Sequence, residues 1–176
     1  MNHGHMPLPL FELWVPATET GALPVDRLVQ WADEQIARLD KPPFWLLELA
    51  TANDVEGIRV AMRSVSLPDC PRKPGDHDVI YLGCLYLCFQ AGRITLFDLL
   101  QRAGSYSDCR SGNWIPDCET FYALLNELDG GGPTIPSDRP LKERVAALFS
   151  PMVGTLRELF GVDESTPVEA MLPEMI

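Results

Sequence analysis

One apolar stretch limits what this chain can fold into. The sequence VIYLGCLYLCFQAG, residues 79 to 92, is its most apolar run. The run lacks the one-sided spacing of an amphipathic helix, so we expect a helix over Val79 to Gln90 that is buried on all sides and is followed by Gly92 as its C-cap. It is about half the roughly 20 residues that a helix needs to cross a bilayer, which argues against a membrane span. The run therefore predicts the centre of a helical core, although the β-branched DVIYL could form a strand.

Helical signals cover most of the remaining chain. From Pro24 to Leu39, an apolar stripe at three- and four-residue spacing ends with Ile36 and Leu39. Thr95 is predicted to cap a helix that Gly104 stops, and Asn53 or Asp54 caps another. Further helices are predicted in FWLLELATA after a proline pair, in ETFYALLNEL, in RPLKERVAALF and, with Ser150 as cap, in SPMVGTLRELF, and one turn in the tail TPVEAMLPEMI. No stretch shows sustained alternation of apolar and polar residues, so the prediction is an all-α bundle or helix-pair array of about 7 to 8 helices.

The first 22 residues are predicted to be different. Pro7, Pro9 and Pro16 interrupt their apolar run, so we expect an extended N-terminal segment over 1–22, with Leu13 and Trp14 among the side chains that dock on the domain. This segment also lacks the basic region of a targeting signal. The expected location is therefore the cytoplasm.

Length and composition favour one domain, 1–176, and the chain contains an internal similarity. Its 176 residues, 46% of them hydrophobic, suit a single core. GALPVDRLVQWAD at 21–33 aligns without gaps with GRITLFDLLQRAG at 92–104, and FWLLEL is later matched by FYALLNEL. This order suggests a duplication of 21–65 and 92–129 into two related helical halves. Helix caps and leucine stripes alone also generate part of such a match.

The charge of the chain limits its partners. The sequence has 25 acidic and 14 basic residues, a formal net charge of -11. A phosphate backbone or an anionic membrane surface would be repelled, so we expect neither nucleic acid nor membrane as a partner. A basic protein would be attracted, although the same acidity can serve solubility alone.

Few residues suggest chemistry. Cys84 and Cys88 lie one turn apart, a spacing that two metal ligands can use, but their apolar neighbours favour a place in the core, so we predict no metal site. No CxxC pair occurs, and the thiols are expected to be reduced. DGGGPTIP lacks the lysine of a phosphate-binding loop, so no cofactor is predicted. His77 is the only histidine outside the terminus and is either a general base or an exposed residue at a helix start.

The stretch from Gly104 to Cys118 is the strongest candidate for a functional surface. We predict a loop that binds a partner or ligand through Tyr106, Asp108, Arg110, Asn113 and Trp114, since aromatic residues and arginine concentrate binding energy. The alternative is structural: Trp114 and Ile115 would fill a gap between helices.

These observations favour a binding protein over an enzyme. No family motif is present, but in general character the chain resembles small, acidic, all-helical bacterial proteins, some of which neutralise toxins. The functional hypothesis is a protein-interaction module, in one form an inhibitor or immunity-type partner of a basic protein. The alternative is an enzyme or small-ligand-binding protein that uses the 104–118 loop, with Cys109 or His77.

Overall fold

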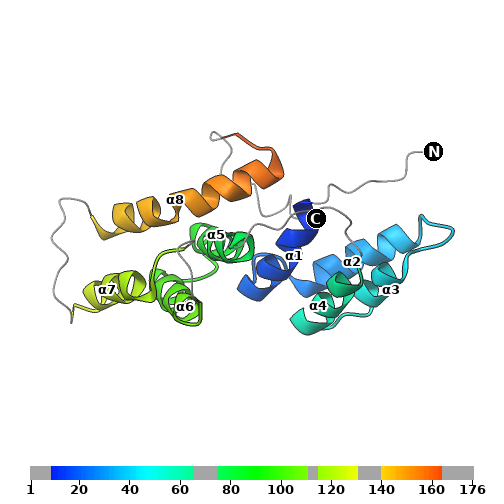
Figure 1. The fold of residues 1–176 in the computed structure, drawn as a ribbon, viewed down its shortest axis with the longest axis horizontal. Coiled ribbons are helices and arrows are strands. Elements are labelled where there is room, and N and C mark those ends of the chain that lie inside the picture. The colour runs from blue at the N-terminus through cyan, green and yellow to red at the C-terminus, as the bar shows by residue number, and fades with distance from the viewer. Residues whose placement is uncertain (1–8, 66–74, 111–114, 131–139, 164–176) are drawn as a thin grey trace.

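The computed structural model describes residues 9–65, 75–110, 115–130 and 140–163. These residues form eight helices and no strand, which confirms the all-α fold class. The helices are α1 (Pro9–Thr20), α2 (Val25–Ile36), α3 (Phe44–Ala50), α4 (Val55–Ser64), α5 (Asp76–Gln90), α6 (Leu96–Asp108), α7 (Cys118–Leu128) and α8 (Leu141–Phe160). Helices α1 and α5 pack together in the middle, α2 to α4 lie at one end, and α6 and α7 lie at the other, with α8 along α5 (Figure 1). No described helix combines the length and the apolar character that crossing a bilayer requires.

Helix α5 is the central element because its two faces belong to different core clusters. The face toward α1 to α4 carries Ile80, Cys84, Leu87 and Cys88. The face toward α6 to α8 carries Leu82, Leu85 and Tyr86. Each set recurs at helical spacing, so a helix with neighbours on both sides must be apolar all round. The prediction of a buried central helix is confirmed, and the DVIYL segment is helical.

A glycine inside α5 allows α8 to approach closely. A Cβ atom placed on Gly83 would lie 2.8 Å from the Leu156 Cδ1 atom and 3.1 Å from the Met152 carbonyl oxygen. Both separations are tighter than ordinary contact between heavy atoms. The absence of a side chain at residue 83 therefore sets the distance between these two helices.

The extended segment predicted over 1–22 is wrong for its described part, which contains helix α1 with Pro16 inside it. A proline in a helix costs about 3 kcal/mol or more, so packing must compensate. Leu13, Trp14 and Ala17 are fully buried in the first core cluster, as predicted for Leu13 and Trp14. Burial of a tryptophan and its neighbours is large enough to offset the proline.

The predicted stop at Gly104 is also wrong, because α6 continues to Asp108. Gly104 instead lies against α7: a Cβ atom there would be 2.8 Å from the Tyr122 ring. This glycine serves close packing of two helices and does not end one. The start of α6 agrees with the prediction, since Thr95 and Asp98 form a reciprocal capping box.

The two helices predicted on either side of Ser150 are one helix, α8, with Pro151 inside it. Its buried residues, Val145, Phe149, Met152, Val153 and Leu156, form one stripe that runs past the proline. This continuous apolar face holds both halves of α8 on the same neighbours.

The first half follows the predicted pattern more closely. Asp54 caps α4 by accepting a hydrogen bond from the Gly57 amide. Helix α2 ends at Ile36, however, so Leu39 lies beyond it and is 42% exposed instead of buried. Gly21 and Gly92 both have positive φ after a helix, as the proposed repeat requires, but the duplication stays a prediction. The turn predicted in the tail lies outside the described residues.

Candidate functional site

Charged and aromatic side chains from four elements meet where α1, α4, α5 and α6 come together. We call this group the polar junction; its members are Glu19, Arg59, His77, Asp78, Tyr106 and Arg110. Glu19 comes from α1 and Arg59 from α4, while His77 and Asp78 lie in the first turn of α5. Tyr106 is in the last turns of α6, which the prediction had placed in a loop.

Hydrogen bonding in the junction fixes the proton positions. The Tyr106 hydroxyl donates to the Asp78 Oδ1 atom at 2.8 Å, and the His77 Nδ1 atom lies 3.0 Å from the hydroxyl oxygen. Because a hydroxyl has one proton to donate, His77 must supply the proton for its own bond. The imidazole therefore carries hydrogen on Nδ1, and its Nε2 atom lies 3.9 Å from the Glu19 Oε2 atom.

Glu19 is engaged by Arg59, which joins α4 to α1. The Arg59 Nε atom donates to Glu19 Oε1 at 3.1 Å, and a second guanidinium nitrogen binds the same oxygen. Its Nη1 atom donates to Glu56 Oε2 at 2.9 Å. These two carboxylates raise the pKa of Arg59 further above its ordinary value. The Glu19 charge is thus largely compensated before His77 is considered.

Burial sets the protonation state of the junction. It lowers the pKa of His77, although the nearby Glu19 and Asp78 carboxylates act in the opposite direction. The side chain is still 44% exposed, so this desolvation is partial. Burial, followed by the hydrogen bond to Asp78, raises the pKa of Tyr106. Near neutral pH the junction therefore holds a neutral imidazole and a protonated phenol.

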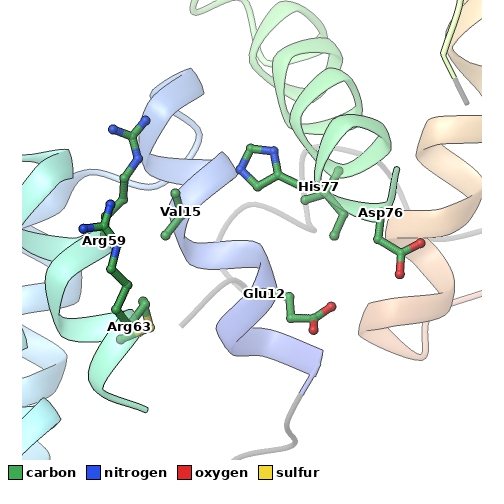
Figure 2. Close-up of a pocket in the computed structure, with 8 residues that line it drawn as sticks. Glu12, Val15, Arg59, Arg63, Asp76 and His77 are labelled. Carbon is green, nitrogen blue, oxygen red and sulfur yellow. The ribbon is translucent and has the colours of Figure 1, made fainter. Parts of the chain in front are cut away.

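A cavity of about 290 Å³ opens beside His77, between α1, α4 and α5 (Figure 2). Arg59 and Arg63 line it from α4, whereas Glu12 and Asp76 lie on the other side of α1 in this view. Its apolar lining comes from Val15, Met62 and Ile80. The described lining carries both signs of charge, which favours no single class of ligand.

The structure divides the predicted binding residues. Tyr106 and Arg110 lie together, with the Arg110 Cζ atom 4.8 Å from the Tyr106 ring centroid and its Nε atom 3.6 Å from Asp78 Oδ1. Asp108 ends α6, is exposed, and accepts a 3.5 Å hydrogen bond from the Cys118 thiol of α7. Asn113 and Trp114 lie outside the described residues.

Sequence reasoning missed the acidic partners of this group. Asp78 lies 28 residues from Tyr106 in the sequence, and Glu19 reaches His77 only because α1 packs on α5. The motif GDHDV carries the histidine and one carboxylate side by side, and it was the one available signal. His77 does lie at the start of a helix with an exposed side chain, as one of the two interpretations held.

The cysteines are divided between core and surface. Cys84 and Cys88 are fully buried in the first core cluster, and burial raises the pKa of both thiols. Cys109 is exposed and Cys118 is half-buried. Within the described ranges, no group of three or more histidine, cysteine or acidic side chains is placed to hold a metal ion.

Apolar side chains are exposed where α2 leads into α3. Leu39 is 42%, Phe44 69% and Leu47 41% exposed, and we call these three residues the α2–α3 tip. Phe44 and Leu47 lie one turn apart on one side of α3, whereas Leu46 and Leu49 on the opposite side are buried. The connection between the two helices lies at one end of the molecule (Figure 1). Packing of α3 therefore makes little use of Phe44.

No protein-family model matches the chain, and neither does any curated protein or solved structure. Function is therefore inferred from the side chains themselves.

Proposed function

We propose that this chain is a protein-interaction module that binds a basic partner through the α2–α3 tip. The observation that carries the proposal is the 69% exposure of Phe44, with Leu47 one turn further along and Leu39 in the preceding connection. Exposed apolar patches on a protein surface often mark interaction sites, and aromatic residues concentrate binding energy. If the partner is a basic enzyme or toxin, the chain would act as its inhibitor or immunity-type partner.

The backbone presents Phe44 in a fixed position. Pro43 is the N-cap residue of α3, and its φ of -66°, which the proline ring fixes, restricts the chain just before Phe44. A side chain on a short, well-anchored helix loses less conformational entropy on binding than one on a free loop. Because α3 is anchored by Leu46 and Leu49, Phe44 remains available for a partner.

Charge supports a basic partner. Asp33 and Asp40 are exposed on either side of the end of α2 and make no ion pair within the described ranges. Glu34 is also exposed and lies 4.0 Å from Arg38. A net charge of -11 adds long-range attraction, which speeds encounter with a positively charged surface.

The free thiols support the cytoplasm as the place of action. Cys84, Cys88, Cys109 and Cys118 form no disulfide, as expected in a reducing compartment.

Capture of partners with matched variants tests the proposal. The tagged chain, Phe44→Ser and Phe97→Ser would be incubated with cell lysate; Phe97 is a 39% exposed aromatic on α6, at the other end of the molecule. We expect basic proteins to be retained by the parent and by Phe97→Ser but lost with Phe44→Ser. They should also be released near 1 M salt, where charges are screened within about 3 Å.

The affinity for a purified partner then shows whether Phe44 is part of the interface. Loss of a central aromatic anchor typically costs about 2 kcal/mol, roughly thirtyfold in Kd. Equal affinity of the parent and Phe44→Ser would move the interface away from the α2–α3 tip. If the parent retains only acidic proteins, the proposal that the partner is basic is wrong.

A further inference from the structure

A second cavity, of about 440 Å³, lies between α5 and α6 and has a different chemical character from the one beside His77. Two arginines line it, Arg102 and Arg110, together with the tyrosines Tyr81 and Tyr106. No carboxylate side chain is among its described lining residues, in a chain whose acidic residues outnumber its basic ones by 25 to 14. Such local concentration of positive charge on an acidic protein requires an explanation.

We propose that this cavity binds a small molecule through an oxyanion, a phosphate or carboxylate group held between Arg102 and Arg110. Guanidinium groups bind such anions with paired, charge-assisted hydrogen bonds. The site is separate from the α2–α3 tip, so its failure would leave the proposed protein-binding function untouched.

Arg102 is fixed in place without losing its charge. Its Nη2 atom donates to the main-chain oxygen atoms of Glu19 at 3.3 Å and Thr20 at 3.2 Å, at the end of α1. These acceptors are uncharged carbonyl groups at the negative end of the α1 dipole, which the positive guanidinium group complements. They orient the guanidinium group without pairing it with a carboxylate.

Arg110 is held by an aromatic column. Tyr81 and Tyr106 are stacked with their ring centroids 3.8 Å apart and their planes 8° from parallel. Since Tyr81 occupies one face of the Tyr106 ring, Arg110 covers the other, with its Cζ atom 4.8 Å from the centroid. A guanidinium group stacked on a ring keeps its in-plane N–H groups free for an acceptor.

The Asp78 carboxylate lies close to this column, and it is shared between two groups. Asp78 accepts the Tyr106 hydroxyl proton at 2.8 Å and lies 3.6 Å from the Arg110 Nε atom. It therefore offsets part of the Arg110 charge. Arg102 in turn interacts electrostatically with the Asp98 carboxylate, one turn earlier on α6. Neither carboxylate is among the described lining residues, so the described lining itself carries two positive groups and no acidic side chain.

The remaining lining residues suit a polar ligand. Gln101, Ser105 and Cys109 supply an amide, a hydroxyl and a thiol. A volume of about 440 Å³ exceeds what a bare phosphate ion needs and falls within the usual range for small-molecule sites. The occupant is thus expected to carry an organic group beside its oxyanion. This assigns Tyr106 and Arg110, predicted from the sequence as binding residues, to a ligand site.

Titration with simple probes tests the site. Phenyl phosphate and benzoate carry a ring with either oxyanion, and phenol carries the ring alone. Isothermal titration calorimetry would be run on the full chain, on Arg102→Gln and Arg110→Gln, and on the control Arg38→Gln, an exposed arginine on the other side of the molecule that pairs with Glu34. Thermal melting would establish that each variant is folded, with Arg102→Lys in reserve if Arg102→Gln is not.

We expect phenyl phosphate or benzoate to bind the parent and Arg38→Gln with equal affinity. Binding to Arg102→Gln and to Arg110→Gln should be at least tenfold weaker. Phenol should not bind. Whichever anion binds more tightly identifies the oxyanion. The proposal is overturned if neither anion binds the parent at about 10 mM, or if either anion binds Arg102→Gln and Arg110→Gln as tightly as the parent.

Discussion

Helices α5 and α3 are both rich in apolar residues, yet the structure uses them differently. In α5, every residue from Leu82 to Cys88 is buried, because helices pack on two of its faces. In α3, Leu46 and Leu49 are buried while Phe44 and Leu47 face solvent. Packing therefore accounts for the apolar content of α5 but not for that of α3. Apolar residues that packing leaves unexplained are the ones that indicate a binding surface.

A charge placed on each helix should give the largest contrast. Leu85→Asp would bury an unpaired carboxylate in the second core cluster, at a cost of several kcal/mol against a total stability of about 5 to 15 kcal/mol. We expect this variant to be unfolded in circular dichroism at 25 °C. The same change at exposed Leu47 should leave the helical spectrum and melting transition intact. A folded Leu85→Asp with an unchanged melting temperature would show that α5 is not core.

Within α3, truncation on its two sides should separate packing from exposure. Leu46→Ala removes a side chain that is 1% exposed and should lower the free energy of unfolding by about 2 to 5 kcal/mol. Phe44→Ala removes a larger side chain that is 69% exposed. This variant should change the free energy of unfolding by less than about 0.5 kcal/mol. Urea titration measures both. A loss with Phe44→Ala as large as that with Leu46→Ala would make Phe44 a packing residue and weaken the proposed interface.

Two glycines test how closely α5 meets α8. Gly83→Ala adds a methyl group against the Leu156 side chain and Met152 carbonyl, so we expect a loss of about 1 to 3 kcal/mol despite the better helix propensity of alanine. Gly154 lies within α8 with no atom within 4 Å of its would-be Cβ, and Gly154→Ala should gain about 0.5 to 1 kcal/mol. Thermal melting of both variants and the parent measures these changes in stability. Stabilisation by Gly83→Ala would mean that the two helices can separate without penalty.

A small, pH-dependent effect on stability is expected from His77, at the exposed start of α5. Burial lowers the pKa of His77, so the unfolded chain takes up a proton at higher pH than the folded chain does. The stabilisation is complete above the unfolded pKa, about 6.5, and is lost as the pH falls through the window below it. Because the side chain is 44% exposed, we expect a contribution under about 1 kcal/mol.

Comparison of the parent with His77→Gln isolates that contribution. The free energy of unfolding of each would be measured from pH 8 to pH 5 by urea titration. We expect the variant to lose less stability on acidification than the parent. A variant that loses as much or more would show that His77 is more easily protonated in the folded chain than its surroundings indicate.

Local sequence signals predicted the interior and several helix starts. The apolar run around Leu85 identified the central helix, and Thr95 and Asp54 cap their helices through their own side chains, as their residue types suggest. These features depend on neighbours within a few residues or on the total burial of one segment. Both kinds of information are present in a single sequence.

Signals that distant packing overrides were misleading. Pro16 and Pro151 lie inside helices because a buried apolar stripe runs past each of them. Gly104 supports close contact with Tyr122 where a helix end was expected. In each case the residue has a local preference, and a helix far away in the sequence decides the outcome.

The candidate sites were only partly accessible to such reasoning. Composition alone singled out Tyr106 and Arg110, but their contacts with Asp78 and Tyr81 depend on how α6 packs on α5. The exposure of Phe44 could not be read from FWLLELA, since a rotation of the helix by about half a turn would have placed it in the core.

The double role of α5 has a consequence for how the molecule opens. Because its two faces complete both core clusters, neither end of the protein keeps its core if α5 leaves, and the two ends are expected to unfold in a single cooperative step. Amide hydrogens from Leu82 to Cys88 should then exchange with solvent only through global unfolding, whereas those of the short helix α3 should exchange through local opening of lower free energy. A partner that binds α3 would slow that local exchange first and leave the slowest amides of the chain governed by the stability of the whole.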